Sequence, residues 1–266
     1  MSLLILGGGG RLGRLLRSVW PDRSATIWHG GTDADLQFDI LADPDALSDA
    51  ISQASSILLL AGVTQDRQDR PFSTNTALAQ AVLDAADGKP VLLASSASIY
   101  GRARGVLTED MPPMPESDYG KSKHAMEQLA GKYPNTTCLR IGNVAGADAL
   151  LGTARETYML DQFSDGTYPM RSYIGPGLLA QVISGLNSKV TQGTSLPHIL
   201  NIACPDPISM ANLLDAAAKN WRATPAPNTA IKTVHMDTTR LWDLLPKPNS
   251  SAADIVTDWR SSVGQM

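Results

Sequence analysis

The chain has 266 residues, of which 43% are hydrophobic and 18% charged, and its formal net charge at pH 7 is −4. This length and composition suffice for a globular protein with a substantial core, and the absence of a basic block argues against nucleic acid or an anionic membrane as a partner. The two cysteines lie in apolar segments, which predicts buried, reduced thiols, and the four histidines are scattered, which predicts no metal site. No run approaches about 18 apolar residues, and no signal-peptide core is visible, so we expect a cytoplasmic location.

The first 145 residues alternate short apolar runs with amphipathic segments. We predict strands at residues 3–6, 25–28, 56–61, 90–95 and 136–141, and helices at residues 11–19, 45–52, 73–86 and 119–131. Asp43 and Pro44 mark the start of the second helix, as an N-cap and a first-turn proline. Short strands that alternate with longer helices are typical of βαβ units around a parallel sheet.

After residue 145 the pattern loosens, and proline and glycine become frequent. We predict helices near residues 177–186, 210–219, 238–244 and 252–260, and strands near 198–202 and 231–235. We therefore divide the chain into an α/β domain, residues 1–145, and a mixed region, residues 146–266. Part of the mixed region is expected to complete the α/β core, and part to form a small C-terminal substrate lobe.

A glycine-rich stretch, GGGGRLG, follows the first strand and opens the first helix. Its glycines fit G-x-G-x-x-G through Gly8, Gly10 and Gly13, or G-x-x-G-x-x-G through Gly7, Gly10 and Gly13. Glycine allows the tight turn, and backbone N–H groups at the helix start can then approach a pyrophosphate. This context predicts a Rossmann-type, doubly wound parallel sheet that binds a dinucleotide, with a plain turn as the alternative.

The second strand does not end in the acidic residue that commonly holds the ribose 2′-hydroxyl of NAD. Residues 28–32 read WHGGT, and Asp33 and Asp35 come a few residues late. With no carboxylate to repel a 2′-phosphate, the sequence slightly favours NADP over NAD. The Arg11 guanidinium could pair with that phosphate, or Arg11 could be a solvated helix residue.

Tyr119 and Lys123 are four residues apart at the start of a predicted helix, so they share one face. A tyrosine hydroxyl is a poor acid or base at neutral pH, but a nearby ammonium group favours the phenolate. The pair could pass a proton to or from a substrate oxygen while a hydride moves to or from a nicotinamide.

The segment at residues 90–101, PVLLASSASIYG, is an apolar strand that ends in serines. Together with the glycine loop, the YGKSK and LRIGNVAG segments and the later HILNIACP segment, it resembles the extended short-chain dehydrogenases/reductases. These are NAD(P)-dependent epimerases, dehydratases and reductases that act mostly on nucleotide sugars. The resemblance covers most of the chain in the family's order, with Arg140 and Asn143 at matching positions.

This resemblance implies roles for individual residues. Ser96 would hydrogen-bond the substrate oxygen, Tyr119 would be the acid/base, and Lys123 would bind the nicotinamide ribose and tune Tyr119. Ser98 and Asn143 would join Ser96 in binding the substrate. The implied cofactor-binding residues are Gly7, Gly8, Gly10, Arg11, Leu12, Gly13, Asp39, Ile40, Ala61, Gly62, Val63, Asn75, Tyr119 and Lys123.

The resemblance also leaves the reaction open. Dehydratases usually carry an Asp-Glu pair just after the serine, where this chain has Ser98 and Ile99. Glu109 and Asp110 lie in the following loop, where acids are most often solvated, so a dehydratase is disfavoured. We expect an epimerase or oxidoreductase of a sugar or nucleotide sugar. The alternatives are an NADPH-dependent carbonyl reductase of a non-nucleotide substrate and a catalytically silent NADP-binding scaffold or sensor.

Two further expectations concern partners. The family often dimerises through the helices predicted at residues 73–86 and 119–131. Small side chains there would let helices of two subunits approach closely, or would pack onto the sheet of the same chain: Ala77, Ala81, Ala85 and Ala86. Four arginines are candidates for binding a substrate phosphate, or are ordinary surface residues: Arg102, Arg104, Arg155 and Arg171.

Overall fold

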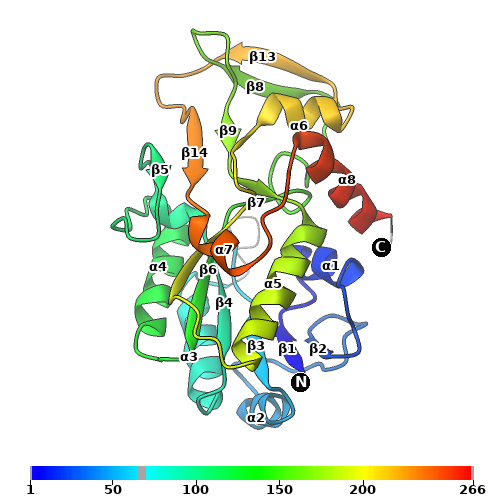
Figure 1. The fold of residues 1–266 in the computed structure, drawn as a ribbon, viewed down its shortest axis with the longest axis vertical. Coiled ribbons are helices and arrows are strands. Elements are labelled where there is room, and N and C mark those ends of the chain that lie inside the picture. Colours follow the sequence, from blue (N-terminus) through cyan, green and yellow to red (C-terminus); the bar gives the residue numbers. More distant parts are fainter. Residues whose placement is uncertain (1, 65–69, 265–266) are drawn as a thin grey trace.

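A six-stranded parallel sheet forms the centre of the computed structural model, which describes residues 2–64 and 70–264 (Figure 1). The strand order is β11-β6-β4-β3-β1-β2, so the order reverses between β1 and β3. This is the predicted α/β fold with a Rossmann-type, doubly wound sheet. Its strands are β1 (Leu3–Leu6), β2 (Thr26–His29), β3 (Ser56–Leu59), β4 (Val91–Ser96), β6 (Thr136–Ile141) and β11 (Ile199–Ile202).

Helices cover both faces of the sheet, so its central strands are buried on both sides and consist mainly of apolar residues. Leu3 and Ile5 of β1 belong to the core under one set of helices, and Leu4 and Leu6 to the core under the other. The first set is α1 (Arg11–Ser18), α5 (Pro176–Thr191) and α8 (Ala252–Val263), and the second is α2 (Pro44–Ser52), α3 (Thr74–Ala85) and α4 (Asp118–Ala130).

The chain between β2 and α2 contains no helix. A single parallel bridge joins His29 to Leu36, and α2 begins eight residues later at Pro44. As predicted, Asp43 caps α2, its side chain accepting a 3.0 Å hydrogen bond from the Ala46 backbone N–H.

The remaining elements form a lobe above the carboxyl ends of the strands (Figure 1). Its small sheets have the orders β12-β9-β14-β5, β10-β7 and β13-β8. The elements are η1 (Ala97–Tyr100), β5 (Val106–Leu107), β7 (Asn143–Val144), β8 (Tyr158–Gln162), β9 (Met170–Arg171), β10 (Tyr173–Ile174), β12 (Ile208–Ser209), α6 (Met210–Ala216), β13 (Trp221–Pro225), β14 (Thr233–Met236) and α7 (Thr239–Leu244).

Several elements after residue 145 differ from the prediction. The helix predicted to end at residue 219 ends at Ala216, because Ala218 takes a left-handed conformation with φ of 53°. The helix predicted near 177–186 continues to Thr191. Strands β8 and β13 pair with each other and were not predicted. By contrast, β11 lies within the strand predicted near residues 198–202, and it forms one edge of the main sheet.

The helices predicted to mediate a dimer, α3 and α4, pack against each other within the chain. Ala86 is buried, Ala81 and Ala85 are half-buried, and Ala77 is exposed. Dimerisation through this face stays a prediction. In the described ranges, no helix is both long and apolar enough to cross a membrane.

Candidate functional site

The glycine loop lies between the end of β1 and the start of α1, over the point where the strand order reverses. Gly7 has a φ of 106°, and a Cβ there would collide with the backbone N of Ala61 in the chain after β3. A Cβ at Gly13 would lie 2.7 Å from Cα of Gly8, so α1 also needs glycine to approach the loop. The first turn of α1 therefore lies at the end of the sheet, and the backbone N–H groups of a helix N-terminus commonly bind anions.

The end of β2 packs directly on this loop. The Gly7 and Gly8 N–H groups both donate to the His29 carbonyl oxygen, at 3.2 and 2.8 Å. Asp35, one of the two late acids, accepts a 2.8 Å hydrogen bond from the Trp28 N–H, so its carboxylate closes the turn after β2. Arg14 donates to the Gly9 carbonyl oxygen, and Arg11 is exposed at the start of α1.

A cavity of about 230 Å³ brings together five of the predicted cofactor residues: Asp39, Ile40, Ala61, Gly62 and Val63. His29, Phe38, Arg70, Thr74 and Leu78 also line it. Arg70 donates to Asp39 at 2.8 Å, and this hydrogen bond keeps the pKa of Asp39 below its ordinary value. The helix-free connection after β2 is what places Asp39 and Ile40 beside the chain after β3.

Asn75 joins this cavity to the helix that carries Tyr119 and Lys123. Its side-chain oxygen accepts from the Val63 N–H at 2.8 Å, and its amide donates to the Val63 carbonyl at 3.2 Å and to the Ser122 hydroxyl at 2.9 Å. The Ser122 hydroxyl donates in turn to the Tyr119 carbonyl oxygen at 2.8 Å. Buried Asn75 thus fixes the distance between the end of β3 and the first turn of α4.

Lys123 is 5% exposed, so its ammonium group lies inside the fold. Its ammonium donates a 2.7 Å hydrogen bond to the Ala94 carbonyl oxygen and lies 5.9 Å from the centre of the Tyr119 ring. A Cβ at Gly62 would lie 3.6 Å from Nζ, which shows how closely the ammonium approaches the predicted cofactor residues. Burial lowers the pKa of Lys123 to about 8, and the Cys138 thiol and the Glu127 carboxylate offset part of that effect.

The serine segment lies against the start of α4. Ser96 is the last residue of β4, and its hydroxyl oxygen accepts a 3.1 Å hydrogen bond from the Ser98 N–H. A Cβ at Gly120 would lie 2.7 Å from the Ser98 carbonyl oxygen, so this segment contacts the turn next to Tyr119. The Ser98 hydroxyl is buried and has no hydrogen-bond partner among the described residues. A buried hydroxyl of this kind is suited to a ligand or to water.

Asn143 follows the strand beside β4. Ser96 is in register with Ile141 of β6, and Asn143 comes two residues later, in β7. Its backbone N–H donates to the Ser172 carbonyl oxygen at 2.9 Å, and its side-chain amide donates to the hydroxyl oxygen of Tyr173, which itself donates to Asp148 at 2.7 Å. The substrate residues predicted on two separate segments, Ser96 with Ser98 and Asn143, thus lie at the carboxyl ends of neighbouring strands.

A buried ion pair behind the site was not predicted. Arg140 of β6 is 1% exposed and Glu127 of α4 is 4% exposed, with 2.8 Å between Arg140 Nη2 and Glu127 Oε2. Glu127 also accepts a 2.7 Å hydrogen bond from Ser95, and Arg140 donates to the Tyr100 hydroxyl at 3.0 Å. A charged residue inside the apolar segment TTCLRI is the signal that could have indicated this pair.

The expectation of solvated loop acids is wrong for Glu109 and holds for Asp110. Glu109 is 7% exposed and accepts a 3.0 Å hydrogen bond from the Asn201 backbone N–H, so it is a structural group under the lobe. Asp110 is exposed and pairs with Arg240.

Of the four arginines considered for a substrate phosphate, Arg104 and Arg155 are exposed, and Arg102 pairs with Glu116 at 2.9 Å. Arg171 is half-buried and donates to the Met170 carbonyl oxygen at 2.8 Å. Within residues 2–64 and 70–264, no three His, Cys, Asp or Glu side chains gather in a way that could hold a metal ion.

A comparison with protein families identifies the family of the chain. The family model described as the NAD dependent epimerase/dehydratase family matches residues 3–175, well over half of the chain. The chain belongs to this family. The match confirms the resemblance to the extended short-chain dehydrogenases/reductases, whereas no curated protein matches the sequence.

Solved structures share the fold at low identity. A UDP-glucose-4-epimerase from Stenotrophomonas maltophila, with bound NAD and formylated UDP-arabinopyranose, is 19% identical, with a TM-score of 0.79 over 99% of this chain and 98% of that chain. A UDP-glucose 4-epimerase from Brucella ovis in complex with NAD is 17% identical, with a TM-score of 0.80 over 96% of each chain. A short-chain dehydrogenase/reductase superfamily protein from Agrobacterium tumefaciens, with bound NAD, is 18% identical, with a TM-score of 0.77 over 100% and 98%.

Proposed function

We propose that this protein is an NAD(P)-dependent epimerase or oxidoreductase that acts on a hydroxyl or carbonyl group of a sugar or nucleotide sugar. One observation carries the proposal. The buried ammonium of Lys123 lies 5.9 Å from the centre of the Tyr119 ring and next to Gly62, which lines a cavity with four other predicted cofactor residues. Membership of the NAD-dependent family and the NAD-bound structural neighbours agree with it.

The residues fit a dinucleotide in three places. The first turn of α1 would hold the pyrophosphate, because a helix N-terminus presents backbone N–H groups to an anion, and the glycine loop brings this turn close to the end of the sheet. The cavity at Asp39 and Ile40 would hold the adenosine end. Lys123 would bind the nicotinamide ribose, and a bound nicotinamide would accept or supply a hydride.

The chain's own groups would then manage the proton and the substrate. Tyr119 would take the proton from a substrate hydroxyl, or return it to a carbonyl oxygen, with the Lys123 ammonium stabilising the phenolate. The Ser96 hydroxyl would donate to the same oxygen, and the unpartnered Ser98 hydroxyl and Asn143 would orient the sugar. These roles suffice for an epimerase or an oxidoreductase, whereas a dehydratase needs a second acid and base and therefore stays disfavoured.

Replacing Tyr119 by phenylalanine tests this function, because it removes the proton carrier and keeps the ring that packs near Phe72. Turnover of UDP-sugars, followed by product NMR and by nicotinamide absorbance, should fall roughly 10²- to 10⁴-fold, while cofactor affinity changes little. An unchanged turnover number in Tyr119→Phe would overturn the proposed site.

The same assay separates the two reactions. An epimerase converts one sugar into its isomer with no net change in nicotinamide absorbance and keeps its cofactor through purification. A reductase consumes NADPH in proportion to product. Cofactor binding without any turnover would instead support the silent scaffold.

A further inference from the structure

The serine segment is anchored in the protein through Tyr100, which takes no part in the proposed proton transfer. Tyr100 is 1% exposed and is the last residue of η1, the four-residue helix that Ser96 caps. Its hydroxyl accepts a 3.0 Å hydrogen bond from Arg140 and donates a 2.7 Å hydrogen bond to the side-chain oxygen of Asn201. Burial raises the pKa of Tyr100 above its ordinary value, so the hydroxyl keeps the proton that it donates. Because η1 is so short, fixing Tyr100 also fixes the serines at its start.

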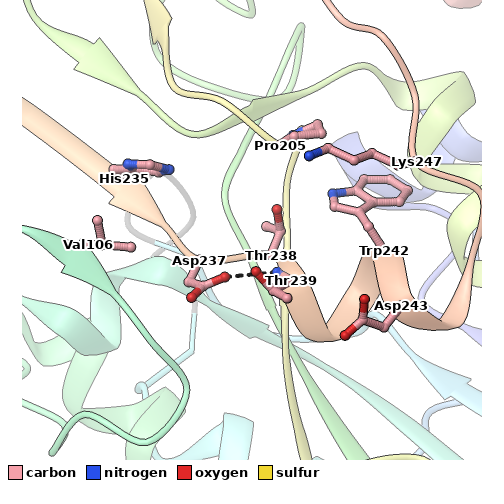
Figure 2. A pocket seen from close by; sticks show the side chains of 9 residues that line it. All are labelled: Val106, Pro205, His235, Asp237, Thr238, Thr239, Trp242, Asp243 and Lys247. Carbon is pink, nitrogen blue, oxygen red and sulfur yellow. Dashed lines mark hydrogen bonds between the residues drawn. The ribbon is translucent and has the colours of Figure 1, made fainter.

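Asn201 connects Tyr100 to the lobe. It is fully buried in β11, at the edge of the main sheet, and its amide donates to the Leu107 and Asp237 carbonyl oxygens, both at 2.9 Å. Leu107 belongs to β5, and it is joined to Asp237 directly by a 2.9 Å hydrogen bond from the Asp237 N–H to the Leu107 carbonyl oxygen. Figure 2 shows Asp237 where β14 leads into α7, with its carboxylate accepting a 2.8 Å hydrogen bond from the Thr239 N–H. One buried amide therefore holds two strands of the lobe.

The same lobe strand, β14, leads to Asn143. The Met236 N–H donates to the Ser172 hydroxyl oxygen at 2.8 Å, and the Ser172 carbonyl oxygen accepts the 2.9 Å hydrogen bond from the Asn143 N–H. The hydrogen bond from Tyr100 to Asn201 thus joins the two segments predicted to bind the substrate, one at the serines and the other at Asn143.

The loss of this one hydroxyl would have a defined effect on the buried polar groups around it. Such networks hold a single arrangement, because a buried group that loses its partner is left unsatisfied. Without the hydroxyl, the Asn201 side-chain oxygen and one Arg140 N–H lose a partner, while Arg140 keeps its 2.8 Å contact with Glu127. The core beneath the site would therefore stay in place, and the serine segment would lose its connection to the lobe.

We propose that Tyr100 is a positioning residue, whose hydroxyl holds the serine segment and β14 in the relative position at which the serines and Asn143 contact one substrate. This inference rests on the proposed function, which assigns those contacts. Tyr100 itself is enclosed and acts through Asn201. A displacement of about 1 Å between reacting groups can cost about 10²-fold in rate, so even a small movement of the lobe would be visible in turnover.

Tyr100→Phe tests the proposal, because it removes the hydroxyl and keeps the ring that lies 4.9 Å from the Arg140 guanidinium carbon. With UDP-sugars, kcat should fall about 10- to 100-fold while KM changes by less than about threefold, because misplaced groups fail mainly in the transition state. The affinity for the cofactor should be that of the parent.

The matched control is Tyr158→Phe. It removes another buried tyrosine hydroxyl of the lobe, which donates to the Thr153 carbonyl oxygen at 2.9 Å, and it should keep the parent kcat. An unchanged kcat in Tyr100→Phe, or an equal loss in Tyr158→Phe, would overturn the proposal.

Hydrogen–deuterium exchange gives a second readout that needs no turnover. In Tyr100→Phe the backbone N–H groups of Met236 and Asp237 should exchange at least about tenfold faster, while those of β1 keep the parent rate. Tyr119→Phe should lose turnover and keep the parent exchange rates. Unchanged exchange in Tyr100→Phe would refute the positioning role. Faster exchange in a protein whose parent shows no turnover would support the connection through Tyr100 and count against the proposed function instead.

Discussion

Replacing Lys123 by methionine removes a charge that the fold holds in a buried position. Lys123 is 5% exposed, and burial lowers its pKa from 10.5 to about 8. The native protein therefore binds fewer protons than the unfolded chain between pH 8 and pH 10.5, and the stability of the parent rises with pH across this window. Below pH 8 the buried ammonium costs stability. Methionine has a similar length and no charge, so it removes that cost.

The magnitude follows from the same values. The difference between 10.5 and about 8 corresponds to roughly 3 kcal/mol at about 1.4 kcal/mol per pH unit. Methionine also loses the 2.7 Å hydrogen bond to the Ala94 carbonyl oxygen, which contributes about 1.5 kcal/mol. We expect Lys123→Met to stabilise the cofactor-free protein by about 2 kcal/mol at pH 7, which raises Tm by roughly 4–8 °C. Turnover should be lost.

Thermal unfolding of nucleotide-free parent and variant, at pH 7 and near pH 10.5, measures this effect. The gain in Tm should be present at pH 7 and largely disappear at the higher pH, where the parent lysine is neutral in the native state and already half neutral in the unfolded chain. Lys132→Met, at an exposed position, controls for the general effect of losing a lysine and should change the free energy of unfolding by less than about 0.5 kcal/mol. A variant that melts below the parent at pH 7, or a gain in Tm that is the same at both pH values, would refute the reasoning.

Two further predictions concern the ion pair and the cofactor. Glu127→Gln should destabilise the protein by about 3–5 kcal/mol in urea unfolding, because it leaves the buried charge of Arg140 without its carboxylate partner. The double variant Glu127→Gln with Arg140→Met should recover most of this loss, and losses that simply add would contradict the prediction. Arg11→Ala should lower the affinity for NADPH about tenfold and leave the affinity for NADH unchanged in fluorescence titrations, whereas equal effects on both would show that Arg11 does not contact a 2′-phosphate.

The sequence predicted the central sheet well because its strands are buried on both faces. Such strands are short runs dominated by apolar residues, as in Leu3–Leu6, and the helices between them carry ordinary start signals such as Asp43 and Pro44. No partner far away in the chain is needed to recognise them. The glycine spacing and the Tyr119–Lys123 spacing are local patterns as well.

The lobe was harder to predict because its strands are defined by distant partners. Strand β8 pairs with β13, about sixty residues later, and β9 pairs with both β12 and β14. Strands of two to five residues carry little periodicity of their own, and tertiary pairing decides where they begin and end. The burial of Glu109 has the same origin, since its partner Asn201 lies in β11 at the edge of the main sheet.

The arrangement around α4 shows why a local motif alone could not describe the site. Lys123 and Glu127 lie one helical turn apart, so the face that presents the ammonium to the proposed cofactor site also presents a carboxylate to the core. Arg140 holds that carboxylate from β6, and Asn75 holds the first turn of α4 from the other side. The position of Tyr119 therefore depends on residues from α3, β6 and the chain after β3. A pattern that joins the tyrosine and lysine to a glutamate four residues later, and to an arginine inside the next apolar strand, would describe this requirement better than Y-x-x-x-K alone.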